Sequence, residues 1–283
     1  MKSLVTFSAV FVIICRIFIL HAAFNNEIIS YADSILDIEA REKAVDVDYW
    51  QKRVLLKGRP ARSRVYADMD REKIRALKKL AGEFKRLCIP DGCKDIQKKF
   101  ILSRKLRIDT LIKSVDYSKR LPLGGMCDTE YREVFGDWFN DRLNLESESY
   151  RYYKLAWAEL AEKLPLGSRL PPFRLLDYEF GLYEANIKGW LAGQYCSEEA
   201  ATYRIWYRYV NAVDAPEAVS KIQADFLNAD SLKIQSVENK LPAPDRAELD
   251  RRARVLNENA WLELSRKIEA AYSIQNDTRN LAY

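Results

Sequence analysis

Histidine is nearly absent from this chain of 283 residues, in which His21 is the only example. His21 lies at the end of an apolar N-terminal segment that we expect to be removed, so the mature chain would carry no imidazole. Ser-His-Asp and Cys-His catalytic systems need an imidazole base, and catalytic zinc sites commonly use histidine ligands. The sequence also lacks a Walker A loop and a GxGxxG segment, which cradle phosphates in many nucleotide-binding proteins. We therefore predict no catalytic residue, no metal and no cofactor.

A sustained alternation of apolar and polar residues is missing too, which argues against a protein rich in strands. Apolar residues instead recur at three- and four-residue spacing, as they do along amphipathic helices. This spacing predicts helices over Ile28–Val45, from Asp68 or Asp70 to about Leu87, over Asp95–Val115, after Pro216 and over Asp245–Tyr272. The apolar face of the last helix would be formed by Leu249, Ala253, Leu256, Ala260, Leu264 and Ile268. The predicted fold class is an all-α, multi-helix globular protein.

The first 23 residues have the features of a secretory signal peptide. Lys2 precedes an uncharged apolar run over Leu4–Cys15, and the small residues Ala22 and Ala23 follow shortly after it. We predict cleavage at this point and a secreted or periplasmic protein. The alternative is an uncleaved anchor that leaves the chain on the exported side of a membrane. In that case Arg16 would lie inside the spanning helix, at a cost of about 2.5–3.5 kcal/mol.

Removal of the leader would also remove Cys15 and leave four cysteines, which are Cys88, Cys93, Cys127 and Cys196. In an oxidising compartment an even number of cysteines indicates disulfides. A Pro-Asp-Gly turn separates Cys88 from Cys93 and predicts a local bond between them, which leaves Cys127 to pair with Cys196. A four-thiolate zinc site is the alternative, but it normally needs two closely spaced cysteine pairs, and only one is present. We therefore expect a fold stapled by two disulfides.

Positive charge is concentrated in one part of the chain. The net charge is only +5, but residues 52–120 contain 22 Lys and Arg against 8 Asp and Glu, so this stretch carries +14 and the remainder −9. At its start lies a segment over Lys52–Arg64, here called the basic strap, whose Gly58 and Pro60 disfavour regular structure. We predict anion binding by its six basic residues, Lys52, Arg53, Lys57, Arg59, Arg62 and Arg64. The alternative is a linker that docks on the acidic C-terminal half.

Aromatic residues follow an internal similarity. Leu-Pro-Leu-Gly occurs at 121–124 and again at 164–167, and each copy is followed by a Gly-x-Trp or Gly-Trp segment and then by a Tyr-Arg pair. This similarity suggests a duplicated helical hairpin. We divide the chain into a signal peptide or anchor (1–23), an N-terminal helix with the basic strap (24–67), a basic helical region (68–120) and an aromatic-rich helical domain (121–283).

These observations favour an exported, non-enzymatic helical protein that binds an envelope partner or an anionic surface. One alternative is a histidine-independent carboxylate enzyme acting on glycans or cell wall, because close acidic pairs such as Glu146 with Glu148 are present. Another is an assembly subunit whose helix over Asp245–Tyr272 pairs with a partner. An exported chain is not expected to bind nucleic acid, and membrane contact is expected only through the N-terminal segment. The sequence leaves the oligomeric state open.

Overall fold

The fold is all-α, as predicted. The computed structural model describes the backbone of residues 2–57, 63–120, 128–193, 199–239 and 241–280, and the side chains of these ranges apart from 2–24, 63–64, 118–120, 128–135, 199 and 274–280. The α-helices in these ranges are α1 (Lys2–Val54), α2 (Ser63–Phe84), α3 (Lys94–Arg120), α4 (Asp128–Ala161), α5 (Phe173–Gly193), α6 (Glu199–Asn211), α7 (Ser220–Glu238) and α8 (Ala243–Asn280). A short 3-10 helix, η1 (Glu217–Val219), precedes α7, and the described ranges contain no strand.

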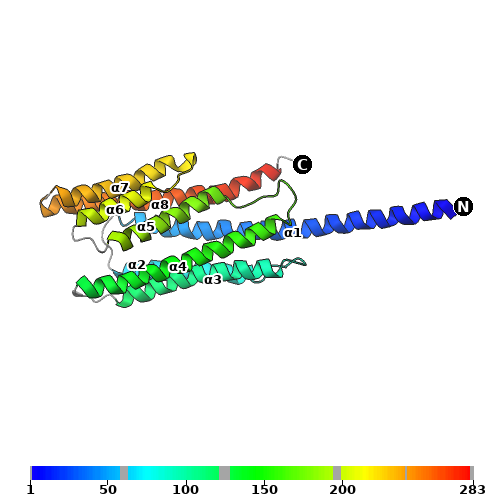
Figure 1. Cartoon of the computed structure of the whole chain (residues 1–283), viewed down its shortest axis with the longest axis horizontal. Coiled ribbons are helices and arrows are strands. Elements are labelled where there is room, and N and C mark those ends of the chain that lie inside the picture. The colour runs from blue at the N-terminus through cyan, green and yellow to red at the C-terminus, as the bar shows by residue number, and fades with distance from the viewer. Residues whose placement is uncertain (1, 58–62, 121–127, 194–198, 240, 281–283) are drawn as a thin grey trace.

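The helices form an elongated bundle around α1 (Figure 1). On one side α1 packs against α2, which packs against α3, and α3 in turn packs against α4. On the other side α1 packs against α8, and the series continues through α7 and α6 to α5. The helix α5 also touches α4 and α8, so it lies between the two sides of the bundle. A central space is therefore bordered by α1, α3, α4 and α5.

Several helix boundaries follow from local sequence. The helix α5 begins directly after Pro171 and Pro172, and α8 has Pro244 in its first turn, where a proline is tolerated because its missing N–H would have no partner. Asp95 and Asp245 stand in the first turns of α3 and α8, and a carboxylate there interacts favourably with the helix dipole. The predicted helices over 68–87, 95–115 and 245–272 are thus present, each shifted by some residues at its ends.

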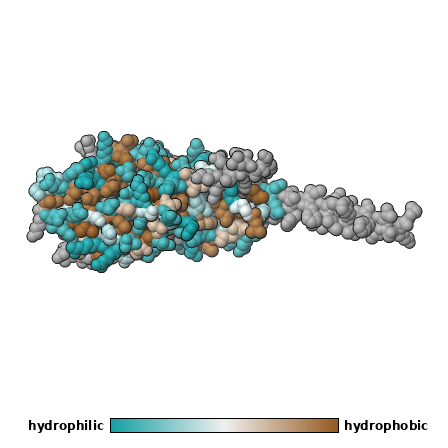
Figure 2. Space-filling view, turned by 90° about the horizontal axis from the view of Figure 1, so that it is seen from above, coloured by the Kyte–Doolittle hydropathy of each residue, from teal (hydrophilic) through white to brown (hydrophobic). Residues whose placement is uncertain are grey.

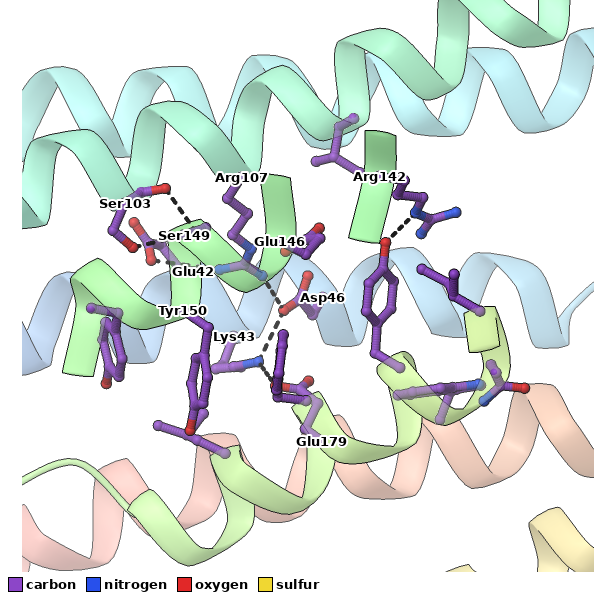
Figure 3. A pocket seen from close by; sticks show the side chains of 18 of the residues that line it. Glu42, Lys43, Asp46, Ser103, Arg107, Arg142, Glu146, Ser149, Tyr150 and Glu179 are labelled. Atoms are coloured by element: carbon purple, nitrogen blue, oxygen red, sulfur yellow. Dashed lines mark hydrogen bonds and ion pairs between the residues drawn. The ribbon is translucent and has the colours of Figure 1, made fainter. Parts of the chain in front are cut away.

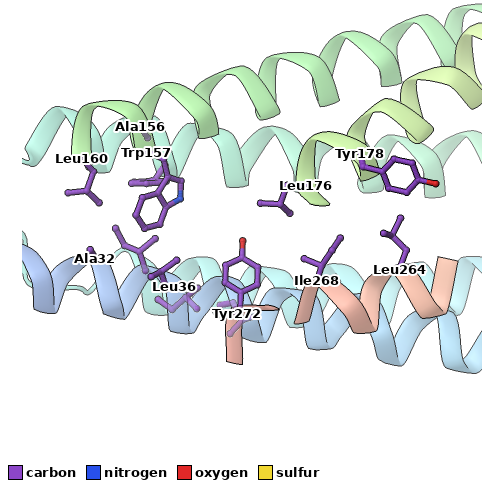
Figure 4. Close-up of a cluster of buried hydrophobic side chains, with 14 of the residues drawn as sticks. Ala32, Leu36, Ala156, Trp157, Leu160, Leu176, Tyr178, Leu264, Ile268 and Tyr272 are labelled. Atoms are coloured by element: carbon purple, nitrogen blue, oxygen red, sulfur yellow. The ribbon is translucent and has the colours of Figure 1, made fainter. Parts of the chain in front are cut away.

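One hydrophobic core joins most of the helices. In Figure 4, Leu36 of α1, Trp157 and Leu160 of α4, and Leu264 and Ile268 of α8 lie along one layer between the helices, and all belong to the same buried cluster. Full burial of a large apolar side chain contributes about 1.5–3 kcal/mol. The predicted apolar face of α8 is confirmed at Ala253, Ala260, Leu264 and Ile268, which are all buried. The division proposed at residue 67 falls inside α2, and the core draws on all three regions that follow the leader.

The helix α1 is much longer than predicted. It spans 53 residues without interruption, and its N-terminal part extends beyond the ends of the other helices (Figure 1). Ile28, which has no exposed surface, is the first core residue among the side chains that the structure describes, and it follows the predicted cleavage site by a few positions. Among the side chains that the structure describes, no helix has a stretch long and apolar enough to span a bilayer.

The predicted duplication of a helical hairpin is wrong. The first of the two similar segments, which contains Trp138 and Tyr150, lies within the single uninterrupted helix α4. The second crosses from α5 to α6, and these two helices do form a hairpin. Its glycines allow a close approach, because a Cβ added at Gly189 would lie 2.6 Å from Cδ1 of Trp206 and one at Gly193 would lie 2.5 Å from Cγ2 of Thr202.

The predicted bond between Cys88 and Cys93 is not present. The turn exists, with Gly92 at a φ of 75° and the Cys93 amide donating to the carbonyl of Pro90. The turn directs Cys93 into the core, where it has no exposed surface, while Cys88 is exposed, and both are free thiols. Cys127 and Cys196 lie outside the described residues.

The surface mixes polar and apolar residues. Figure 2 shows hydrophobic side chains scattered among hydrophilic ones on the face seen from above. The large hydrophobic residues that are most exposed come from separate elements and connections, namely Leu55, Val65, Leu155, Leu166 and Tyr209. These residues therefore form no common patch among the described side chains.

Candidate functional site

A cavity of about 410 Å³ lies in the space between α1, α3, α4 and α5, and residues of α2, α6 and α8 complete its lining (Figure 3). Its volume is within the range of about 300–1,000 Å³ that is typical of sites for small molecules. Charged side chains form one part of the lining and aromatic rings form another. This cavity is the candidate functional site.

Asp46 is the centre of the charged part. One of its carboxylate oxygens accepts a hydrogen bond from Arg107 at 2.6 Å, the other lies 2.7 Å from the Lys73 ammonium, and Lys43 lies 3.4 Å away. Lys43 also pairs with Glu179 of α5. Burial alone would raise the pKa of Asp46, but the three cations outweigh it and hold this pKa well below its ordinary value. Asp46 is therefore ionised at any physiological pH.

Two further acids of α1 continue this part of the lining toward the core. Glu42 accepts a hydrogen bond from Nε of Arg104 at 2.8 Å and lies 3.7 Å from Arg107. The Arg104 side chain is only 6% exposed, and its guanidinium stacks 3.9 Å above the ring of Phe84. Its Nη2 lies 3.5 Å from Glu39 but forms no hydrogen bond. One donor of a buried arginine at the cavity is thus left unsatisfied.

Glu39 accepts three hydrogen bonds. They come from Trp157 Nε1 at 3.0 Å, from the Tyr153 hydroxyl at 3.0 Å and from the Tyr272 hydroxyl at 3.2 Å. Burial raises the pKa of Glu39 to about 7, although Arg104 and the hydrogen bonds lower it in part. Because both oxygens already accept bonds, this carboxyl group is held in place by three residues from two other helices.

Arg142 and Glu146 lie one turn apart on α4 and differ from the other charged groups of the cavity. Arg142 donates to the hydroxyl of Tyr183 and stacks on the rings of Trp138 and Tyr183, but it has no carboxylate partner among the described residues. Glu146 makes no hydrogen bond or ion pair within the same part of the chain. Burial raises the pKa of Glu146, and the nearby charges of Arg107 and Arg142 oppose this only in part. In Figure 3 both side chains extend from α4 toward the cavity.

The aromatic part of the lining comes from five helices. Phe139 and Trp190 lie 4.2 Å apart between ring centroids, Tyr150 stacks on Phe180 at 4.6 Å, and Trp50 stacks on Trp261 at 5.6 Å. Trp206 completes this part, and its buried Nε1–H group has no hydrogen-bond partner. An unsatisfied buried donor costs about 1–3 kcal/mol, so two such donors at one cavity call for a functional explanation.

The residues predicted to bind anions lie outside this cavity. Lys52 and Arg53 belong to the last turn of α1, where Lys52 pairs with Asp48 and Glu72. Arg53 pairs with Glu258 of α8 at 3.3 Å and stacks on the ring of Tyr66. Lys57 is exposed, and its carbonyl accepts a bond from Arg251 of α8. Arg59 and Arg62 lie outside the described residues, as does the side chain of Arg64. In the described part of the basic strap, Arg53 and the Lys57 carbonyl therefore contact α8, whereas Lys52 pairs with acids of α1 and α2.

The cavity residues were not identified from the sequence as a site. A signal is nevertheless present in α1, where Glu39, Glu42, Lys43 and Asp46 recur at three- and four-residue spacing directly after the apolar stripe that ends at Ile38. Such a polar stripe on a buried helix indicates a polar space at that level of the bundle. The described residues contain no group of three or more metal-ligating side chains arranged to hold an ion.

Comparison with protein-family models, with curated proteins and with solved structures finds no match for this chain. The function of the cavity must therefore be argued from its own geometry.

Proposed function

We propose that this chain is an exported, non-enzymatic helical protein that binds a small amphipathic ligand in the central cavity. The observation that carries the proposal is the lining of the cavity, which combines aromatic rings with polar groups that lack partners. Pockets for small molecules are mostly apolar and use a few well-placed polar groups to orient the ligand. The unsatisfied donors on Arg104 and Trp206 fit this description.

Binding accounts for the charged groups better than catalysis does. Most of the charges pair with one another, as Asp46 does with three cations and Glu42 with two arginines. Replacing a buried ion network by well-packed apolar residues is often neutral or stabilising, so such a network is weak evidence for a purely stabilising role. A network of this kind holds the side chains of four helices in fixed positions, and a binding site benefits because a rigid lining loses little entropy on binding.

The proposal is tested by filling the cavity. Leu111 lines it from α3, and Leu111→Trp should reduce its volume, whereas Leu155→Trp adds the same side chain at a site on α4 that is 41% exposed. Native mass spectrometry of protein isolated gently from its own host should show a bound small molecule in the wild type and in Leu155→Trp, but not in Leu111→Trp. A wild-type mass equal to that of the bare polypeptide, together with no binding in a screen of small amphiphiles, would refute the proposal.

Export and the cysteine pairing are parts of the same proposal. The mass of the polypeptide measured after denaturation, with and without reductant, would report cleavage near Ala23 and the number of disulfides. We expect a bond between Cys127 and Cys196, and a bond between Cys88 and Cys93 only if the turn rearranges, because Cys93 is buried in the reduced form. An uncleaved chain in which all five thiols are free would contradict export to an oxidising compartment.

Binding to an envelope partner or an anionic surface is kept as a second role for the basic strap. Because Lys52 and Arg53 already have acidic partners, this role rests on Lys57, Arg59, Arg62 and Arg64. An assembly role for the helix over 245–272 is less favoured, since its apolar residues Ala253, Ala260, Leu264 and Ile268 are buried within the same chain.

A carboxylate enzyme acting on glycans or cell wall is favoured by one observation. Glu39 and Asp46 line the same cavity, and their pKa values are displaced in opposite directions, as those of an acid and base pair often are. Against this reading, both oxygens of Glu39 already accept hydrogen bonds from aromatic residues. Turnover of purified cell wall by the wild type that is abolished in Glu39→Gln would establish the enzyme and overturn the binding proposal.

A further inference from the structure

Three residues that line the cavity, Arg104, Arg142 and Trp206, have N–H groups that form no hydrogen bond. Nη2 of Arg104 and Nε1 of Trp206 are buried and form no hydrogen bond. Arg142 is bonded to a neutral tyrosine hydroxyl and has no carboxylate partner among the described residues. Among the acids, Glu39, Glu42, Asp46 and Glu179 each accept from at least one cation or donor, whereas Glu146 makes no hydrogen bond or ion pair. A ligand that completes this lining must bring acceptors.

An organic cation is the first ligand that an aromatic-lined cavity suggests, because ammonium groups bind over aromatic faces. Here that position is already taken by the protein itself, since the Arg142 guanidinium lies 5.5 Å from the ring centroid of Trp138 and 4.9 Å from that of Tyr183. A second cation beside it would also be repelled by Lys73 and Arg107. At the position of Arg142 the arrangement therefore disfavours the cationic group of a ligand.

We propose that the ligand is a small organic acid with an apolar body, whose carboxylate is bound by Arg142 and whose body lies among Phe139, Trp190 and Trp206. This inference rests on the proposed ligand-binding function and specifies its chemistry. Arginine suits the role because its planar guanidinium presents paired donors to a carboxylate. Arg142 has donors left after its one bond to Tyr183, since a guanidinium carries five N–H groups.

Glu146 determines how the carboxylate is accommodated. It lies one turn from Arg142 on the same helix, and an ionised Glu146 would repel an entering carboxylate. The groups that face it are Arg107 of α3, Arg142 of α4, Lys73 of α2 and Asp46 of α1. Since Glu146 makes no ion pair and its pKa is raised by burial, it can take up a proton when the acid binds. The protonated Glu146 then donates a hydrogen bond to the ligand's carboxylate, which Arg142 binds.

The test uses three probes that share one body, namely 4-phenylbutyrate, 4-phenylbutylamine and 4-phenylbutanol, measured by isothermal titration calorimetry with the purified protein at pH 7.5. We expect the acid to bind more tightly than both of the others. Arg142→Gln should weaken binding of the acid by about 10- to 100-fold, which corresponds to the loss of charge-assisted hydrogen bonds. Arg142→Lys should weaken it less, because it keeps the charge. The matched control Arg151→Gln, on the exposed face of α4, should bind as the wild type does.

Glu146→Gln tests the proton uptake that is proposed for Glu146. For an acid, this variant should bind at least as tightly as the wild type and should lose the proton uptake, which is measured as the dependence of the binding enthalpy on the ionisation enthalpy of the buffer. Glu148→Gln, at an exposed position two residues away, is the control. Far-ultraviolet circular dichroism would show that each variant is folded.

The outcomes separate the two proposals. Tighter binding of the amine or the alcohol than of the acid would overturn the inference and leave the ligand-binding function standing. Loss of acid binding in a folded Glu146→Gln variant would overturn it as well, because a neutral amide at this position removes the repulsion and should favour the carboxylate. If none of the three probes binds, and no small molecule is retained in the native protein, both proposals fail together.

Discussion

The buried acid Glu39 gives a prediction that tests the charged part of the cavity directly. Its side chain is 4% exposed, and the residues that face it are Arg104 of α3, Tyr153 and Trp157 of α4 and Tyr272 of α8, with Glu42 next to it on α1. Burial raises its pKa from the ordinary value of 4.5 to about 7. Between these two values the folded protein holds a proton that the unfolded chain has released.

The sign and size of the effect follow from this difference. Because the folded state binds more protons, the free energy of unfolding falls as the pH rises through this interval. For one group with these two pKa values, the loss between pH 5 and pH 8 is about 2–3 kcal/mol. Glu39→Gln removes the titration while keeping an oxygen that can accept from Trp157 and an amide that can face the two tyrosine hydroxyls.

We therefore expect the variant and the wild type to have similar stability at pH 5 and to diverge above it. At pH 8 Glu39→Gln should be more stable than the wild type by about 2–3 kcal/mol. Urea unfolding, followed by circular dichroism at pH 5, 6, 7 and 8, measures both free energies. Other buried acids such as Asp230 titrate equally in both proteins, so only the difference between the two curves is used. Parallel curves across this range would refute the reasoning and would mean that Glu39 stays ionised in the folded state.

Three further predictions address the packing, the thiols and the basic strap. Gly189→Ala should destabilise the protein by about 1–3 kcal/mol, because its Cβ would lie 2.6 Å from Trp206. The control Gly82→Ala in α2 has open space and should stabilise the protein by up to about 1 kcal/mol. Equal effects of the two substitutions in thermal unfolding would contradict the close α5–α6 contact. In the reduced folded protein iodoacetamide should modify the exposed Cys88 much faster than the buried Cys93, as peptide mass mapping would show, and equal rates would mean that the turn opens readily. Neutralising Arg59, Arg62 and Arg64 together should weaken retention on heparin at low salt, while unchanged retention would leave the strap as a linker only.

The fold class was predictable because a helix leaves a periodic record in its own sequence. The apolar residues of α8 recur every three or four positions, and four of the six that were predicted to line its buried face are fully buried. The length of α1 was harder to predict from the sequence. Its segment after Val45 contains no glycine or proline to end a helix, but Asp46, Asp48 and Lys52 interrupt the apolar pattern, since this part of the helix borders the polar cavity and the surface.

The cavity could not be located from the sequence because its partners are distant along the chain. Glu42 and Arg104 are separated by 62 positions, and Lys43 and Glu179 by 136, so no local spacing relates them. The uneven distribution of charge did indicate that oppositely charged segments attract each other. Arg53 does pair with Glu258 in the C-terminal half. The arginines at the cavity, Arg104 and Arg107, instead pair with the acids of α1. Which segments would meet depended on the packing of the whole bundle.

The continuity of α1 has a consequence for the evolution of this protein. The helix carries core residues up to Ile38 and cavity acids from Glu39 onward, and each residue of a helix turns the chain by about 100°. Losing or gaining one residue near this junction would turn Glu42 and Asp46 away from Arg104 and Arg107 even if every other amino acid were kept. Homologues that keep this cavity should therefore show no insertions or deletions along residues 28–54, with changes of length confined to the connections between helices. In an alignment, the absence of gaps along this part of α1 would then indicate, better than residue identity alone, which homologues retain this cavity.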